Sequence, residues 1–459
     1  MELSNRKALV LGAGRSGIAS AKFLAKRGST VALYDRKSID SWSDEAKALK
    51  ESHGVGLVDR ELPSWLLDQI DLVVISPGVP TNTIPAQYVD RKDGEVIGEV
   101  ELASRFLKGK TVSITGSNGK TTTTTLIGKI LFDAGLKTQV GGNIGTPLLS
   151  LVESSTDDTW TVVELSSFQL ETIVDFRPDV ALCLNVTPNH LDRYEGFVEY
   201  AAAKRRIFMN QTQSDLAILN ADDAVTAEWA TQLATPVQLF STKRELNEGV
   251  FLRGRELVSR KDGIEAVVTT RDEIFLLGLH NVENILAASA AAMACGVAVE
   301  SIRRSVAYFR GVEHRIEFTG EIAGVRFYND SKATSVDATI KALEAMADGK
   351  GKTILILGGR GKQAPYTPLI PLIESSVRHL VVIGEDAGNI ESQLSGFVST
   401  TRADSFKSSI RLAFEAAQDG DKVLLAPACA SFDMFSSFEE RGSRFKKHVA
   451  ELKAAAAHA

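Results

Sequence analysis

The sequence predicts an α/β protein in which parallel sheets are divided among three domains. Short runs of buried type, rich in Val, Ile and Leu, alternate with helical patterns almost from end to end. The chain has 459 residues, which exceeds the size at which a single hydrophobic core stops growing. Loop-rich segments near residues 100 and 311 separate three such regions. We therefore expect domains over residues 1–100, 101–311 and 312–459.

Composition excludes several classes of protein. A net charge of −6 with no basic arm argues against a dedicated nucleic-acid binder. The three cysteines are widely spaced, which argues against a disulfide framework or a Cys-x-x-Cys metal site and fits a reducing compartment. No run of 18 apolar residues appears, so no membrane insertion is expected. These observations predict a soluble, cytoplasmic protein, and we expect it to be a monomer.

A glycine-rich loop follows the first expected strand. Residues 12–17 read G-x-G-x-x-G, and Asp35 ends the next strand, which is the spacing of a Rossmann-like dinucleotide-binding unit. The glycines let a diphosphate approach a helix N-terminus, so the pattern serves NAD or any other nucleotide diphosphate. An NAD-dependent oxidoreductase therefore stays open at this point. The strands expected in this region cover residues 8–11, 30–34 and 72–75, and a helix covers 18–27.

A second loop, at residues 115–122, carries the strongest chemical signal. It reads Thr-Gly-Ser-Asn-Gly-Lys-Thr-Thr between an apolar strand and a helix, which is typical of a P-loop that holds ATP phosphates. Lys120 is expected to reach the outer phosphates, and the Thr121 hydroxyl to bind Mg²⁺. The standard pattern has a further glycine where this chain has Ile114, so the loop is a shortened form. The flanking strand covers residues 111–114 and the helix 123–130.

Three further side chains in the central region are candidates for chemistry. Glu164 ends a strand expected beside the phosphate-loop strand, where a carboxylate can bind Mg²⁺. His190 follows the end of the next strand and is a candidate metal or water ligand. Lys204, judged from the neighbouring residues alone, belongs to a basic helix face. Other expected elements are strands at 161–165, 180–184 and 216–220, an antiparallel annex within 237–277, and a helix at 281–295.

The third region has polar motifs at the ends of its expected strands. Residues 314–315 and 329–334 bring cations and a carboxylate to the mouth of this domain, either as a clamp on a phosphoryl group or as solvated loops. Residues 358–362 form another glycine loop, with two cations, that suits an anion. The strands are expected at 315–318, 325–328, 353–357, 380–383 and 423–426, and helices at 335–346 and 406–418.

Taken in order, these motifs resemble those of the Mur ligase family. The resemblance covers all three regions. It implies a Rossmann-like N-terminal domain, a central P-loop ATPase-like domain and a C-terminal Rossmann-like domain. It also implies ATP-dependent amide formation in peptidoglycan precursor synthesis, with UDP-N-acetylmuramoyl-L-alanine and D-glutamate as substrates. The segments that carry it are residues 116–122, 164–170, 185–194 with Lys204, 280–284, 329–334 and 428–431.

The resemblance also implies roles for individual residues, with ATP and Mg²⁺ as cofactors. The implied catalytic residues are Lys120, His190, Lys204 and Lys332. The implied ATP contacts are Gly116, Ser117, Asn118, Gly119, Lys120, Thr121, Thr122, Asn284, Arg315 and Asp330. The implied metal ligands are Thr121, Glu164, His190 and Lys204, the last as a carbamylated lysine. The implied contacts with the UDP substrate are Arg15, Ser16, Asp35, Arg36, Gly78 and Asn143, and those with D-glutamate are Thr334, Lys362, Ser431 and Phe438.

Two alternatives remain beside this interpretation. A different amino-acid ligase of the same family, such as one resembling folylpolyglutamate synthase, would share the phosphate loop. An NAD-dependent oxidoreductase would explain residues 12–17 and Asp35 but would leave the loop around Lys120 unexplained.

Overall fold

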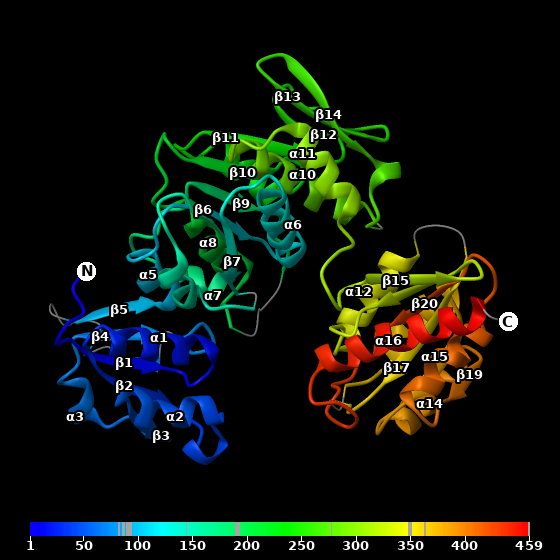
Figure 1. Ribbon diagram of the computed structural model, residues 1–459, viewed down its shortest axis with the longest axis horizontal. Helices are drawn as coiled ribbons and strands as arrows, with labels where there is room; N and C mark the ends of the chain where they lie inside the picture. Colours follow the sequence, from blue (N-terminus) through cyan, green and yellow to red (C-terminus); the bar gives the residue numbers. More distant parts are fainter. Residues whose placement is uncertain are drawn as a thin grey trace. The chain divides into compact units, whose positions relative to one another are not determined.

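The computed structural model describes residues 1–80, 83–84, 88, 94–143, 145–188, 193–276, 278–347, 351–361 and 364–457. The chain separates into two compact units (Figure 1). Unit 1 comprises Met1–Glu273 and Val282–Ala307, and unit 2 comprises Ile274–Asn281 and Tyr308–Ala459. Among the described residues, unit 1 contains two β-sheets and unit 2 contains one, and the predicted α/β class is confirmed.

The first sheet of unit 1 has five parallel strands in the order β3-β2-β1-β4-β5. Alternation along β1 sends Ala8 and Val10 into one core and Leu9 and Leu11 into another, so the sheet is buried on both faces. Strands are β1 Lys7–Leu11, β2 Thr30–Asp35, β3 Gly56–Asp59, β4 Leu72–Ile75 and β5 Glu95–Gly98; helices are α1 Arg15–Lys26, η1 Ile39–Ser41, α2 Asp44–His53, α3 Ser64–Leu67 and α5 Glu99–Ser104.

The second sheet of unit 1 has nine strands in the order β14-β13-β12-β11-β10-β9-β6-β8-β7. Its strands are β6 Lys110–Thr115, β7 Thr138–Gly142, β8 Trp160–Glu164, β9 Val180–Cys183, β10 Leu216–Asn220, β11 Val237–Ser241, β12 Gly249–Arg253, β13 Glu256–Lys261 and β14 Ile264–Thr270. Its helices are α6 Lys120–Asp133, η3 Leu148–Ser154, α7 Ser167–Leu170, α8 Phe197–Arg205, η4 Arg206–Phe208, α9 Ala224–Ala230, η5 Arg271–Glu273, α10 Leu279–Ala294 and α11 Val299–Tyr308.

The antiparallel annex is smaller than predicted. Strand β11 pairs in parallel with β10, and β12 pairs in parallel with β11, so antiparallel pairing is limited to β12, β13 and β14. Helix α9 lies between β10 and β11 in the chain and supplies the crossover that a parallel pair requires. Alternating apolar residues predict strands but do not give their direction, which is why the prediction of an annex from residue 237 was wrong.

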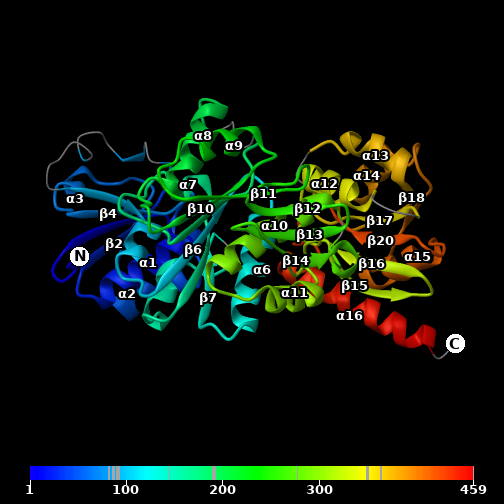
Figure 2. The same ribbon diagram turned by 90° about the horizontal axis from the view of Figure 1, so that it is seen from above.

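The sheet of unit 2 has six strands in the order β15-β16-β20-β17-β18-β19, and its pairs are parallel except for the β15–β16 hairpin. Helix α16 packs against β15 and α15 on its way to the C-terminus (Figure 2). Strands are β15 Glu317–Ile322, β16 Val325–Asn329, β17 Thr353–Gly358, β18 Val377–Ile383, β19 Thr400–Arg402 and β20 Lys422–Leu425; helices are α12 Val336–Met346, η6 Thr367–Leu369, α13 Ile370–Ser376, α14 Ala387–Leu394, α15 Phe406–Glu415 and α16 Phe438–Ala457.

The first strand of unit 2 begins later than predicted, at Glu317 instead of residue 315. His314 and Ile316 have φ angles of 62° and 43°, a left-handed conformation that an extended strand does not contain. An isolated bridge pairs Val312 with Arg315 in this turn. The alternation of polar and apolar residues from residue 315 predicts a strand, but the backbone forms a turn up to Ile316 before the strand begins.

A buried carboxylate joins the first helix after β5 to the region of the second sheet. Glu99 is 2% exposed, and its Oε1 accepts a hydrogen bond of 2.7 Å from the backbone N–H of Leu149 in η3. Its Oε2 has no hydrogen-bond partner among the described residues. Burial raises the pKa of Glu99 to about 7, against the opposing effect of the Leu149 and Leu148 backbone groups.

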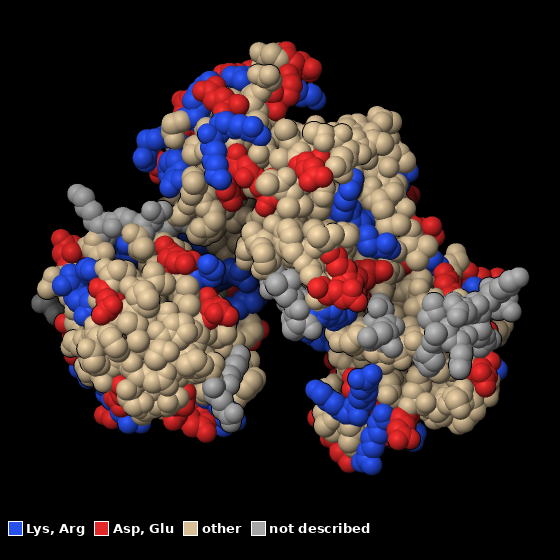
Figure 3. Space-filling model, turned by 180° about the vertical axis from the view of Figure 1, so that it is seen from behind, with Lys and Arg blue, Asp and Glu red and all other residues tan. Residues whose placement is uncertain are grey.

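Charges of both signs are mixed on the surface. Around β12, β13 and β14, Lys and Arg side chains alternate with Asp and Glu (Figure 3), and ion pairs join Arg253 to Glu265 and Arg260 to Glu245. None of the helices in the described part of the chain combines the length and apolar character needed to cross a membrane.

Candidate active site

The phosphate loop connects β6 to α6 as predicted. Gly116 and Gly119 have φ angles of 149° and 85°, and helix α6 begins at Lys120. Backbone N–H groups of Ser117 and Asn118 donate to the carbonyl and side-chain oxygens of Asn185, at 2.9 and 2.8 Å, which fixes the curve of the loop. The backbone therefore forms an anion cradle at the N-terminus of a 14-residue helix.

Gly119 also brings the loop close to α10. A Cβ atom at Gly119 would lie 2.2 Å from Oδ1 of Asn284, so no larger residue fits without a shift. Asn284 is 5% exposed, and its Oδ1 accepts a hydrogen bond of 3.3 Å from Thr123. The structure thus brings Asn284, which is more than 150 positions from the loop, next to the phosphate loop, and its contact with ATP stays a prediction.

Two lysines meet at one carbonyl of this loop. Nζ of Lys120 lies 2.8 Å from the carbonyl oxygen of Gly116, and Nζ of Lys204 lies 2.9 Å from the same atom. Lys204 is 1% exposed, and its Nζ lies 4.7 Å from the centre of the Tyr200 ring. Burial, and next the charge of Lys120, lower the pKa of Lys204 to about 7. The interpretation of Lys204 as part of a solvated basic helix face was wrong.

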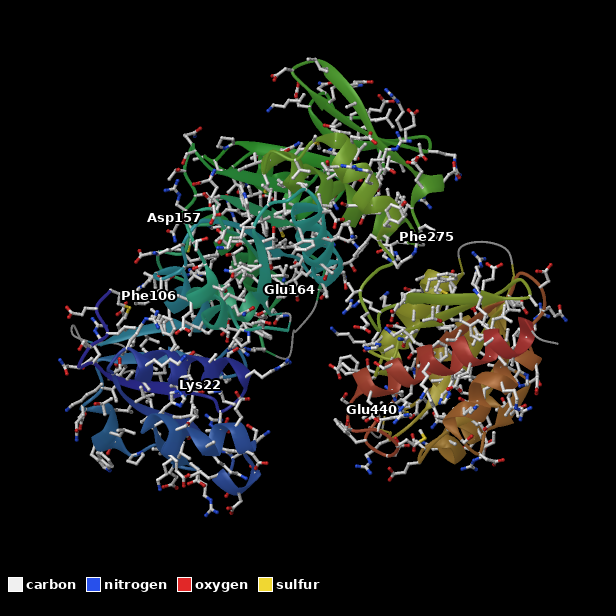
Figure 4. All side chains as sticks on the ribbon, viewed as in Figure 1. Lys22, Phe106, Asp157, Glu164, Phe275 and Glu440 are labelled. Atoms are coloured by element: carbon white, nitrogen blue, oxygen red, sulfur yellow. The ribbon has the colours of Figure 1, made fainter. Side chains whose placement is uncertain are left out.

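Glu164 ends β8, directly beside the strand that leads into the phosphate loop. It lies among the side chains of the central part of unit 1 (Figure 4) and is 2% exposed. Its Oε1 accepts a hydrogen bond of 2.8 Å from the side-chain amide of Asn143, while its Oε2 has no partner among the described residues. A buried carboxylate oxygen of this kind fits a cation such as Mg²⁺, which prefers oxygen ligands.

The metal site cannot be completed from the described residues. His190 lies outside them, as does Lys362 of the expected D-glutamate site. Among the described residues, no group of three or more His, Cys, Asp or Glu side chains is arranged to hold a metal ion. The expected set differs from such a group, because it relies on Thr121 and a modified Lys204 beside Glu164.

A cavity of about 340 Å³ lies at the glycine loop of the first sheet. A Cβ atom at Gly17 would lie 1.8 Å from the carbonyl oxygen of Gly12, so the helix approaches the loop as closely as the fingerprint predicts. The carboxylate of Asp35 accepts hydrogen bonds from the N–H groups of Ala13, at 2.9 Å, and Lys37, at 3.0 Å. Asp35 therefore shapes the loop besides lining the cavity.

The cavity receives residues from both sheets of unit 1. The predicted residues that line it are Arg15, Ser16, Asp35, Gly78 and Asn143. Arg36 is exposed and is not among its lining residues, so its contact with the substrate stays a prediction. Sequence reasoning missed Gly142, which ends β7 of the second sheet, and Gln169, which lies in α7. The Gly-Gly-Asn run at the end of β7 was the available signal for Gly142.

The polar motifs of unit 2 also gather at strand ends. Asp330 follows β16 and is 6% exposed; burial raises its pKa to about 6, and Arg315 opposes this rise. Ser331 Oγ donates to the carbonyl oxygen of Phe438, at 2.8 Å, and Nζ of Lys332 lies 6.0 Å from the Phe438 ring. Residues 330–332 and the start of α16 therefore share one edge of the sheet.

A buried arginine to which the sequence assigned no role holds this edge together. Arg441 is 1% exposed and donates to Ser331 Oγ at 3.0 Å and to the carbonyl oxygen of Cys429 at 3.1 Å. The loop before Ser431, itself 2% exposed, is thus tied to the 329–334 motif. Thr334 lies in that motif, with its N–H donating to the carbonyl of Lys332 at 2.8 Å.

Comparisons with known proteins identify the family to which the three regions of the chain are similar. Three family models match: the MurD-like N-terminal domain of Mur ligases over residues 6–98, the Mur ligase middle domain over 114–292, and the Mur ligase glutamate ligase domain over 314–429. Among solved structures, UDP-N-acetylmuramate-alanine ligase MurC from Thermotoga maritima has a TM-score of 0.57 at 18% identity, covering 97% of this chain and 100% of its own. MurF from Acinetobacter baumannii has a TM-score of 0.58 at 18% identity, covering 97% and 92%. These two likenesses show the fold alone.

Curated relatives are far more similar in sequence. A protein of Koribacter versatilis named UDP-N-acetylmuramoylalanine–D-glutamate ligase is 46% identical over 452 residues, which cover 98% of this chain and 99% of the relative. A protein of the same name from Acidobacterium capsulatum is 47% identical over 459 residues, covering 100% and 99%. Identity of this size over the whole length, with three matching family models, shows that the chain belongs to the Mur ligase family.

Proposed function

We propose that this protein is an ATP-dependent ligase that joins D-glutamate to the alanine carboxylate of UDP-N-acetylmuramoyl-L-alanine, an amide-forming step in peptidoglycan precursor synthesis and hence in cell-wall formation. The observation that carries the proposal is the phosphate loop, in which Lys120 and the buried Lys204 meet beside the strand that ends in Glu164. The name that the relatives carry supports the choice of substrates. Other ligases of the family differ in the amino acid that they add.

The chemistry requires an activated carboxylate, because a carboxylate is a poor electrophile. An oxygen of the alanine carboxylate attacks the γ-phosphorus of ATP, and the bond to the β-phosphate oxygen breaks to release ADP. The amine of D-glutamate then attacks the acyl carbon, phosphate leaves with the electron pair, and the amine loses a proton. Lys120 and Lys332 would balance the negative charge that the two substrates bring together.

The residues present fit a Mg²⁺ ion. Glu164 offers a buried carboxylate oxygen that no described residue contacts, and Thr121 offers a hydroxyl at the start of α6. We assign the ion to these two residues with His190 and Lys204. When bound, Mg²⁺ neutralises charge on the ATP phosphates and orients the reacting oxygens.

Lys204 fits this set only in modified form, because an ammonium group repels a cation. We propose that its Nζ attacks CO₂ and loses a proton, which yields a carbamate with one negative charge. The 1% exposure of the side chain and the nearby charge of Lys120 support this, since both favour a neutral amine. A carbon-13 NMR signal after addition of labelled bicarbonate, absent in Lys204→Ala, would report the carbamate without any turnover.

Rescue of the variant gives a second test of the carbamate. Lys204→Ala is expected to lose most activity and to regain part of it with short carboxylic acids, which supply the missing anion. Lys110→Ala, at the exposed start of β6, is the matched control and should need no rescue. If labelled bicarbonate gives the same spectrum for the wild type and Lys204→Ala, the carbamate is excluded.

The remaining sites are assigned to the uridine diphosphate, to ATP and to D-glutamate. We assign the cavity beside the glycine loop of the first sheet to the uridine diphosphate, with Arg36 at its edge. ATP would also contact Asn284, Arg315 and Asp330. The D-glutamate contacts are proposed to be Thr334, Lys362, Ser431 and Phe438, which offer a cation, hydroxyls and an aromatic edge to a small dianion.

We also propose that the chain forms three domains over residues 1–100, 101–311 and 312–459, one for each substrate, and acts as a monomer. The matched family segments fall within these three ranges and support them. We place the protein in the cytoplasm, where ATP is available. The free thiols of its three cysteines fit a reducing compartment.

A phosphate-release assay tests the function directly. With ATP, Mg²⁺ and UDP-N-acetylmuramoyl-L-alanine, we expect release to depend on D-glutamate and not on L-glutamate, L-alanine or a diamino acid. Release that depends on a different amino acid would assign the chain to another ligase of the family. Tight NADH binding without ATP turnover would favour the oxidoreductase alternative instead.

A further inference from the structure

Arg193, from the region of the second sheet, donates hydrogen bonds to a loop of the first sheet. Nη1 of Arg193 donates to the carbonyl oxygen of Pro77 at 3.1 Å, and its Nη2 to that of Val79 at 3.5 Å. The centre of its guanidinium lies 3.8 Å from the centre of the Phe168 ring, and Nη2 lies 3.7 Å from Oε2 of Glu171. The side chain is 20% exposed, so these contacts are only partly screened by water.

The gripped loop forms one wall of the uridine diphosphate cavity. Pro77, Gly78 and Val79 follow β4 and line the cavity. The N–H of Val79 donates to the carbonyl of Ser76 at 2.9 Å, and Ser76 Oγ donates to the carbonyl of Gly12 at 3.3 Å. Arg193 is not among the lining residues, so it reaches the loop from outside the cavity.

On its other side, the Arg193 guanidinium packs against the aromatic ring of Phe168. Phe168 lies in α7, next to Gln169, which lines the same cavity. Tyr194 stacks on Phe168 with ring centres 5.8 Å apart, and its hydroxyl donates to Glu171. Arg193 therefore links two segments that line the cavity, the loop after β4 and α7.

We propose that Arg193 is a positioning residue for the uridine diphosphate end of the substrate, which fixes the Pro77–Val79 loop against α7 and so sets the width of the cavity. This inference rests on the proposed function of the cavity. A planar guanidinium can stack on a ring and donate to two carbonyls at once, whereas the ammonium group of a lysine cannot do both. The residue acts through the loop and does not take part in the chemical step.

The test compares Arg193→Met with Arg193→Lys. Loss of charged hydrogen bonds to the loop predicts that Arg193→Met raises KM for UDP-N-acetylmuramoyl-L-alanine about tenfold, while KM for ATP stays unchanged. Arg193→Lys should recover part of the affinity, because an ammonium group still donates to Pro77. Arg177→Met is the matched control. Arg177 makes an ion pair with Asp215, with Nε and Oδ2 2.7 Å apart, and neither residue lines the cavity.

A second variant keeps the test valid if Arg193→Met folds poorly. Phe168→Leu leaves the guanidinium but removes its platform, and it should raise the same KM; combined with Arg193→Met, it should add little further. A lower melting temperature with unchanged KM in Arg193→Met, Phe168→Leu and their combination would show a structural role only and overturn the inference. Calorimetric titration of the wild type with the UDP substrate, without ATP, distinguishes a failure of this inference from a failure of the cavity assignment. If the wild type does not bind the substrate, the cavity assignment and the inference are overturned together.

Discussion

Replacing Glu99 by Gln should remove a pH-dependent loss of stability. The carboxyl of Glu99 has a pKa raised by burial from 4.5 to about 7. Between these values the folded protein keeps a proton that the unfolded chain releases. Stability from this group is therefore fully present below pH 4.5 and is lost as pH rises through about 7. The Gln side chain cannot ionise, and its oxygen can still accept the hydrogen bond from Leu149.

The size of the effect follows from the two pKa values. Ionisation linkage predicts that raising the pH from about 6 to about 8.5 destabilises the wild type by about 1.4 kcal/mol through Glu99 alone. The new amide leaves a buried N–H group without a partner, which costs about 1–3 kcal/mol at every pH. The gap in the free energy of unfolding between Glu99→Gln and the wild type should thus shift by about 1.4 kcal/mol in favour of the variant from the lower to the higher pH.

Urea unfolding at both pH values measures this gap. Other groups also titrate in this range, notably Lys204, whose lowered pKa gives stability that rises with pH. Only the difference between variant and wild type therefore isolates Glu99. Glu228→Gln, on the exposed surface of α9, is the control and should follow the wild type at both values. A gap between Glu99→Gln and the wild type that stays constant from low to high pH would refute the reasoning.

Three further predictions concern the phosphate loop and the thiols. Lys120→Ala should lower phosphate release about a hundredfold or more while calorimetric binding of the UDP substrate persists; normal turnover would remove the assignment of the ATP site. Gly119→Ala should weaken ATP binding in the same calorimeter, because its φ of 85° and the 2.2 Å approach to Asn284 oppose a methyl group; unchanged affinity would contradict the loop geometry. All three cysteines have a pKa raised by burial, so an aromatic disulfide reagent at pH 8 should react quickly only after denaturant is added. A fast thiol in the native protein would show that one of them is accessible.

Local motifs were predictable from the sequence because neighbouring residues determine them. The strand, glycine turn and helix around Lys120 are consecutive in the chain, and so are the glycines of residues 12–17 and the first helix. Their backbone conformation follows from residue type, since few residues other than glycine adopt positive φ angles. The carboxyl ends of parallel strands share one edge, which also placed Glu164 beside the loop.

Contacts between distant segments were not predictable in this way. Lys204 lies 88 positions from Gly116, and nothing in its helix shows that its side chain is buried against a carbonyl. The grip of Arg193 on Pro77 spans 116 positions and depends on the packing of two sheets. Only the resemblance to a family pointed to Lys204, and it included Arg193 in residues 185–194 without giving that arginine a role. The direction of β11 was missed because apolar alternation is the same in parallel and antiparallel pairs.

The carbonyl oxygen of Gly116 occupies the hydrogen-bonding position that an anion would take beside Lys120 and Lys204. The folded protein holds the amino groups of Lys120 and Lys204 against one neutral oxygen, so the effect of the Lys120 charge on the pKa of Lys204 is present before any ligand arrives. An incoming polyphosphate would give Lys120 an anionic partner in place of this carbonyl, and the loop backbone that receives it is already shaped by Asn185. ATP affinity should therefore fall with rising salt concentration, and pyrophosphate alone should raise the melting temperature of the protein.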